Sequence, residues 1–104
     1  MMKSEVQSLN KLVQYQDGTI VSKTIIDKKS GSVTFFAFDK DQALSEHTAP
    51  FDALLQVMDG KVEVVISGKS YLLNEGEMII MPADEPHAVK AIDRFKMMLV
   101  MIKS

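Results

Sequence analysis

The sequence predicts an all-β domain, built as a sandwich or barrel of short antiparallel strands. Runs rich in β-branched and aromatic residues recur at a spacing of roughly eight to twelve residues, which is typical of such folds. Turn signals separate these runs, among them Asp17-Gly18, Asp59-Gly60 and Ser67-Gly68. No repeat or low-complexity tract interrupts the pattern. We therefore expect one continuous barrel.

Length and composition limit the class of protein. At 104 residues, with 46% hydrophobic and 25% charged side chains, the chain matches a single globular domain. Its net charge of −2 provides no basic footprint for nucleic acid. No apolar run is long enough to span a membrane, and the polar start Met1–Glu5 lacks the apolar core of a signal peptide. Without cysteine there is no disulfide framework or thiolate nucleophile. We expect a cytoplasmic protein.

The N-terminal segment differs from the rest of the chain. Its apolar residues recur at three- and four-residue spacing: Val6, Leu9, Leu12 and Val13. This spacing predicts a short helix or turn over residues 5–14. We accordingly divide the single domain into an N-terminal segment, residues 1–18, and a β-barrel, residues 19–104.

Strands follow from the Asp17-Gly18 turn to the end of the chain. Glycine tolerates the positive φ of tight hairpin turns, so Asp59-Gly60 predicts a hairpin between its flanking apolar runs. The predicted strands are Thr19–Ile26, Ser32–Phe38, Leu54–Met58, Lys61–Ile66, Lys69–Leu73, Glu77–Met81, Pro86–Ala91 and Phe95–Ile102.

Two of these strands are apolar on both faces. In the last strand Met98, Val100 and Ile102 alternate with a second apolar set, and residues 33–38 behave in the same way. The outer face of a barrel wall normally meets water, so two apolar faces imply a cover. The N-terminal segment is one candidate. A second subunit is the candidate for the remainder, and we predict a homodimer.

A pattern of glycine, proline and histidine residues carries a family resemblance. Its members are His47, Gly60, Gly76, Pro82 and His87. The pattern resembles the double motif of the cupin superfamily, and is most similar to the small single-domain, RmlC-like cupins with a conserved barrel. This resemblance implies a double-stranded β-helix, or jelly-roll barrel, over most of the chain. Cupins include isomerases, dioxygenases, sugar-binding sensors and storage proteins, so the fold alone does not decide the function.

The same resemblance implies a metal site with half its usual ligands. His47 and His87 fall on histidine ligand positions, whereas Ala49 and Ala53 replace a second histidine and a glutamate. Zinc and iron sites usually take three or four protein ligands. The resemblance therefore leaves an incomplete site, where His47 and His87 would hold a divalent zinc, iron, manganese or nickel ion only weakly.

Strand alternation predicts what surrounds the two histidines. The expected lumen residues are His47, Ala49, Ala53, Leu55, Val57, His87 and Val89. We expect both imidazoles to face this lumen, within reach of one bridging atom. A neutral imidazole offers one donor and one acceptor, so the pair suits a carboxylate, an enol or a phenolic hydroxyl.

Three functions remain open at this level. The first is binding or sensing of a small, anionic molecule in the lumen. The second is a metal-dependent enzyme, oxygenase- or isomerase-like, that uses His47 and His87. The third is a dimeric accessory module whose pocket is vestigial. No catalytic residue is assigned, and neither a nucleic acid nor a membrane is an expected partner.

Overall fold

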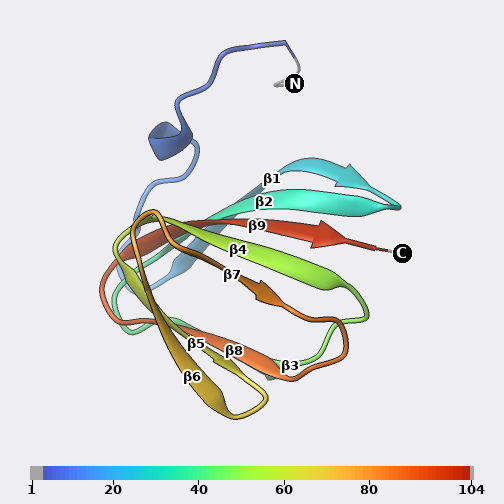
Figure 1. The fold of residues 1–104 in the computed structure, drawn as a ribbon. Helices are drawn as coiled ribbons and strands as arrows, with labels where there is room; N and C mark the ends of the chain where they lie inside the picture. Colours follow the sequence, from blue (N-terminus) through green and yellow to red (C-terminus); the bar gives the residue numbers. More distant parts are fainter. Residues whose placement is uncertain (1–3, 104) are drawn as a thin grey trace.

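Two antiparallel sheets form the protein (Figure 1). The computed structural model describes residues 4–103. The five-stranded sheet has the order β1 (Ile20–Lys28), β2 (Gly31–Phe38), β9 (Phe95–Ile102), β4 (Asp52–Asp59) and β7 (Met78–Met81). The four-stranded sheet has the order β3 (Ala43–His47), β8 (His87–Ala91), β5 (Lys61–Ile66) and β6 (Lys69–Asn74). Among the nine strands, β1–β2 and β5–β6 are consecutive in sequence and paired, whereas the other neighbours come from distant segments. The predicted hairpin at Asp59-Gly60 is wrong, because β4 and β5 belong to different sheets and do not pair with each other. The result is the expected jelly-roll barrel.

All eight predicted strands are present, and the structure adds a ninth. The additional strand, β3, covers Ala43–His47 and carries the first histidine. Its sequence, Ala-Leu-Ser-Glu-His, has no β-branched residue and most of it is exposed, so neither propensity nor alternation indicates a strand there. Pairing with β8 stabilises this strand, although its own sequence has little β-propensity.

The N-terminal segment forms a turn instead of a regular helix. A single 3-10 turn, labelled η1, spans Leu9–Lys11, and the Ser8 side chain makes no capping hydrogen bond. Val6 and Leu9 remain exposed, so the apolar stripe lacks the packing that stabilises a short helix. The division at residue 18 stays a prediction, and residues 1–3 and 104 lie outside the described part. Among residues 4–103, no helix reaches the length and apolarity needed to cross a membrane.

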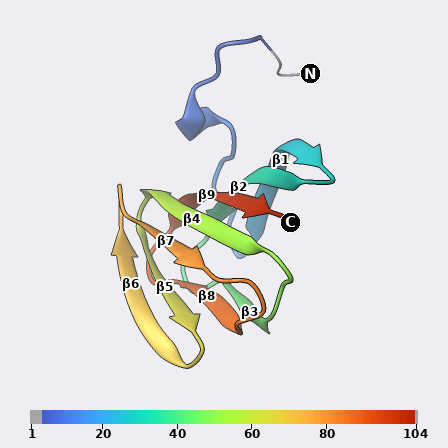
Figure 2. The ribbon, with the colours of Figure 1, turned by 45° about the vertical axis from the view of Figure 1, so that its right-hand side comes forward.

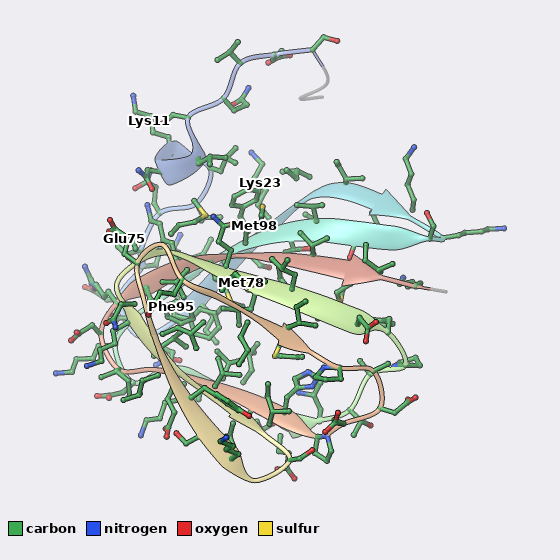
Figure 3. All side chains as sticks on the ribbon, viewed as in Figure 1. Lys11, Lys23, Glu75, Met78, Phe95 and Met98 are labelled. Atoms are coloured by element: carbon green, nitrogen blue, oxygen red, sulfur yellow. The ribbon has the colours of Figure 1, made fainter. Side chains whose placement is uncertain are left out.

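The main core lies between the two sheets (Figure 2). Figure 3 shows Phe95 pointing into this space, and its ring centroid lies 4.6 Å from that of Phe38. Leu55 and Val62, from the two opposing sheets, are completely buried there. The close interdigitation of such side chains fixes the separation of the sheets.

A second apolar cluster lies on the outer face of the five-stranded sheet. Phe35 and Ala37 are buried there under Val13. Met98, labelled in Figure 3, packs against the same cluster. Residues 10–17, which we call the N-terminal strap, provide the cover. The hydroxyl of Tyr15 donates a hydrogen bond of 2.6 Å to Asp59. Both that bond and burial raise the pKa of Tyr15, with burial the larger cause.

Part of this outer face has no cover in the monomer. Register aligns five aliphatic residues across all five strands, and we call them the outer row: Ile26, Val33, Val100, Leu54 and Ile80. The two residues at its ends are 49% and 53% exposed. The expectation that β2 and β9 are apolar on both faces is confirmed. The strap covers only part of the outer face of their sheet.

Candidate functional site

The two histidines of the chain meet at one end of the barrel. His47 is the last residue of β3 and His87 is the first residue of β8, and they are direct cross-strand partners. Their ring centroids lie 4.4 Å apart, with the ring planes inclined at 67°. His87 is 6% exposed, whereas His47 is open to solvent. The buried imidazole is therefore reached past the exposed one.

Both imidazoles are held in the same way by their own backbone. The Nδ1 of His47 lies 2.8 Å from the carbonyl oxygen of Ser45, and the Nδ1 of His87 lies 3.1 Å from that of Glu85. A carbonyl oxygen can only accept, so each Nδ1 carries the hydrogen and donates it. In the neutral ring, each Nε2 then keeps its lone pair. The site thus presents two imidazole acceptors, ready for a hydroxyl group or a metal ion.

Two connections between the sheets close this end of the barrel. The amide of Asp84 donates to the carbonyl of Ala49 at 2.8 Å, which ties the β7–β8 connection to the β3–β4 connection. The carboxylate of Asp52 accepts from the amide of Ala83 at 2.9 Å. Both histidines are joined to these connections, as the loops beside β3 and β8 in Figure 2 show. Backbone hydrogen bonds therefore fix the position of the imidazole pair.

The register of the four-stranded sheet extends the pair into a longer row. His87 pairs with Ile66 on β5, and Ile66 pairs with Lys69 across the Ser67-Gly68 turn. Cross-strand partners share a face of the sheet, so the four residues His47, His87, Ile66 and Lys69 form one line, the mouth row. The ammonium group of Lys69 lies 5.3 Å from the ring centroid of Tyr71, a partly buried residue that packs against the main core.

A cavity of about 460 Å³ opens beside the mouth row. Its lining combines aliphatic with polar groups: Ile66, Ser67, Lys69, Tyr71, Ile79, Ile80, Pro82 and Glu85. The one carboxylate among them, from Glu85, accepts a hydrogen bond of 2.9 Å from the hydroxyl of Ser67. This volume lies within the range of small-molecule sites, which are mostly apolar with a few placed polar groups.

The other predicted lumen residues occupy different places. Leu55, Val57 and Val89 are at most 2% exposed and belong to the packed core, together with Ala53 at 4%. Neither they nor the two histidines line the cavity, which adjoins the histidines through Ile66, the cross-strand partner of His87. Ala49 lies in the β3–β4 connection, where its carbonyl accepts the hydrogen bond from Asp84. The structure thus brings His47 and His87 together, whereas the predicted apolar strand residues lie in the packed core.

Sequence reasoning did not identify the polar wall formed by β6. Two features of the sequence predict the position of this strand. Ser67-Gly68 is a two-residue turn with positive φ at both positions, 48° and 83°, and such a turn makes Ile66 and Lys69 partners. Alternation then sets Lys69 and Tyr71 on one face. The family motif includes the two histidines, but it contains no position on this strand.

The residues present do not form a complete site for a hard divalent metal. In the part of the chain that the structure describes, no group of three or more histidine, cysteine, aspartate or glutamate side chains gathers as a metal site would require. Glu46 is exposed, and Asp52 already accepts a backbone hydrogen bond. Two imidazole nitrogens alone provide fewer ligands than zinc or iron sites normally have.

Comparisons with known proteins agree on the fold. A family model described as a cupin domain matches residues 34–103. A conserved protein of unknown function from Streptococcus pyogenes is 33% identical, with a TM-score of 0.93 over 97% of this chain and 89% of that one. None of the curated proteins searched matches the sequence.

Two further structures mark the range of the likeness. A cupin 2 conserved barrel domain protein from Leptotrichia buccalis is 40% identical, with a TM-score of 0.85 over 88% of this chain, which spans 44% of that protein. A salicylate 1,2-dioxygenase from Pseudoaminobacter salicylatoxidans shares the fold alone, at 16% identity, with a TM-score of 0.75 over 80% of this chain and 25% of that one. With the family model covering most of the chain, the protein belongs to the cupin-domain family.

Proposed function

We propose that this protein binds a small hydroxy-carboxylate at the mouth of its barrel, as a binding or sensing module. The observation that carries the proposal is the mouth row itself. It aligns two imidazoles with the ammonium of Lys69, beside a cavity of about 460 Å³. The proposal places the protein in the cytoplasm, which the absence of cysteine permits.

The polar groups suit the two ends of such a ligand. The ammonium of Lys69 supplies three donors and a positive charge for a carboxylate. The Nε2 atoms of His47 and His87 are acceptors when the rings are neutral, so they accept a hydrogen bond from a ligand hydroxyl. Ile66, which lies between His87 and Lys69 in the row, separates the two functions. A ligand with a carboxylate at one end and a hydroxyl at the other satisfies both.

The remaining lining suits the apolar body of the ligand. Ile79 and Pro82 provide aliphatic surface along the cavity, and Tyr71 provides an aromatic face. Glu85 sets a limit on the charge of the ligand, because its carboxylate repels a second anionic group nearby. We therefore infer a monocarboxylate in preference to a dicarboxylate or a phosphate.

The cofactor remains part of this proposal. If a divalent zinc, iron, manganese or nickel ion occupied the site, the two Nε2 atoms would hold it and other ligands would complete the shell. The alternative function, a metal-dependent oxygenase- or isomerase-like enzyme, relies on that arrangement. Ala49 and Ala53 offer no side-chain ligand, so we rank the enzyme second. A vestigial pocket in a dimeric accessory module is the outcome if neither ligand nor metal binds.

Calorimetry with metal-free protein tests the proposal. The probe is 3-hydroxybenzoate, with benzoate as the analogue that lacks the hydroxyl. We expect saturable binding of 3-hydroxybenzoate and weaker binding of benzoate, because the imidazole acceptors would then lose their partner. Equal affinity for both acids would contradict the assigned role of the histidines. No binding of either at millimolar concentration would refute the proposal.

Two matched lysine variants isolate the charge. Lys69→Met removes the ammonium from the cavity, whereas Lys90→Met removes one from β8 outside the cavity lining. We expect Lys69→Met to weaken 3-hydroxybenzoate binding by about tenfold or more, the usual effect of losing a charged hydrogen bond. Lys90→Met should bind like the original protein. The same loss in both variants would indicate a general effect of net charge.

A further inference from the structure

Two methionines flank the alanine that occupies the missing carboxylate position. Ala53 on β4 pairs with Met81 on β7 and with Met101 on β9. Ala53 and Met81 belong to the core between the sheets, and the partly buried Met101 packs against that core, so all three side chains lie on the inner face. We call Met81 and Met101 the thioether pair. Cross-strand partners have Cβ atoms about 4.5–5.5 Å apart, and the small side chain of Ala53 lies between the two methionines.

The thioether pair and the imidazole pair lie at the same end of the barrel. Met81 ends β7, and the connection that follows it leads directly to His87. Ala53 stands at the start of β4, just after the connection that follows His47. The hydrogen bond between Asp84 and Ala49 joins these two connections. Facing sheets pack about 10 Å apart, so long side chains from the two inner faces meet midway.

This combination of donors differs from a hard-metal site. Thioethers are soft ligands and select copper(I), while imidazole nitrogens also suit copper. Both Nε2 atoms are turned away from the backbone contacts made by Nδ1. Every donor in the set is neutral, and a monovalent ion in such a shell leaves less uncompensated charge near the core than a divalent one. Solvent-exposed His47 provides the entry path.

We propose that His47 and His87, together with a thioether from Met81 or Met101, bind one copper(I) ion per chain. The proposal goes beyond the binding of a hydroxy-carboxylate and does not depend on it. The carboxylate end of that ligand was assigned to Lys69, on the far side of Ile66 in the mouth row. Copper(I) binding is tested without the carboxylate, and carboxylate binding is tested without metal, so the two proposals fail separately.

A competition titration measures the affinity. Metal-free protein is titrated anaerobically with copper(I) in the presence of ascorbate and bicinchoninate, a chromophoric copper(I) chelator. We expect one copper(I) per chain, and loss of that site in His87→Ala. Zinc(II) under the same conditions should bind much more weakly. Tighter binding of zinc(II) than of copper(I) would overturn the proposal.

Methionine variants test the thioether. Met81→Leu/Met101→Leu keeps the side-chain volume nearly constant and removes both sulfur atoms from the site. Met97→Leu is the matched control, because Met97 is a buried β9 residue of the same core that pairs with Val57, further along the strand from Ala53. Even outer-shell partners of a metal typically change affinity 10–100-fold. We expect at least a tenfold loss in the double variant and no change in Met97→Leu.

X-ray absorption on the unsubstituted copper(I) complex provides an independent readout. We expect both sulfur and nitrogen scatterers in the first shell, and loss of the sulfur contribution in the double variant. A first shell of nitrogen and oxygen alone would overturn the proposal even if the methionine variants failed to fold. The two single variants, Met81→Leu and Met101→Leu, then identify which sulfur is the ligand.

Discussion

Asp39 anchors the start of the barrel through three hydrogen bonds to its carboxylate. The amide of Gly18 donates at 2.6 Å, the amide of Lys40 at 2.9 Å, and the guanidinium of Arg94 at 2.7 Å. The Gly18 bond is the largest cause, followed by Arg94, of a pKa for Asp39 of about 2 instead of 3.8. Arg94 also pairs with Asp17 at 2.6 Å. Asp39, which directly follows β2, thus fixes the end of the N-terminal strap.

The lowered pKa of Asp39 predicts a specific loss of stability in acid. The folded state favours the charged carboxylate, so its contribution to the free energy of unfolding is complete above the unfolded pKa of 3.8. It decreases as the pH falls towards the folded pKa of about 2. We expect the difference in stability between the original protein and Asp39→Asn to shrink between about pH 5 and pH 2. Urea unfolding across this range measures it, and a constant difference would contradict the assignment.

At the residue level, the sequence predicted some site residues better than others. His47 and His87 were identified through their register in the family motif, and the structure makes them cross-strand partners. Lys69 and the thioether pair were not identified. Their proximity to the histidines depends on which strands pair, and strand pairing between distant segments is a property of the whole topology. Periodicity indicates which face of a sheet a residue lies on, but it does not indicate which residue of another strand lies beside it.

The turn between β4 and β5, which connects the two sheets, shows how one element determines the geometry of the barrel. Gly60 has φ of +81°, and a Cβ at this position would lie 1.8 Å from the carbonyl oxygen of Arg94. The backbone before β9 therefore packs directly against this turn. Gly76, between β6 and β7, has nearly the same φ of +84° but has no atom within 4 Å of the corresponding position. Comparing Gly60 with Gly76 therefore separates the cost of backbone strain from the cost of steric overlap.

Alanine substitution at these two glycines should give unequal losses. Gly76→Ala carries only the strain of a left-handed residue, about 1–2 kcal/mol. Gly60→Ala carries the same strain plus displacement of the Arg94 backbone. We expect its loss in the free energy of unfolding to be at least about twice as large. Chemical denaturation compares the two. Equal losses in the free energy of unfolding would show that the backbone around Arg94 moves aside without an energetic cost.

The strands differ in how clearly the sequence indicates them. Lys61–Ile66 and Phe95–Ile102 have the predicted bounds, because turn or polar residues stand at both ends of each run. β3 was missed since its pairing with β8 outweighs its weak propensity. The N-terminal stripe was read as a short helix or turn, and only one turn forms. Segments stabilised by distant partners are the ones that local patterns describe least well.

Across the whole molecule, the outer face of the five-stranded sheet is divided between two kinds of cover. The strap buries Phe35 and Ala37, and the buried Lys96 donates from Nζ to the carbonyl of Asn10 at 2.7 Å, which holds the strap in place. The outer row lies beyond the strap and has both ends open to water. A row of aliphatic side chains across five strands is complementary to a copy of itself.

We therefore propose that a second copy of the chain covers the outer row in a two-fold homodimer. A two-fold axis brings each residue of the row to the interface twice. Full burial of one aliphatic side chain contributes about 1.5–3 kcal/mol, and this gain has to exceed the cost of association.

Sedimentation of two lysine variants tests the homodimer. Val100→Lys places a charge at the centre of the outer row, on β9, whereas Val65→Lys places one on the four-stranded sheet, where Val65 lines a different cavity. At micromolar concentration we expect the original protein and Val65→Lys to sediment at twice the chain mass of 11.6 kDa. Val100→Lys should sediment as the monomer, because an unpaired ammonium buried between apolar faces costs more than the contact contributes. A single species of 11.6 kDa for the original protein would refute the dimer. Dimers in all three proteins would instead place the interface on another face.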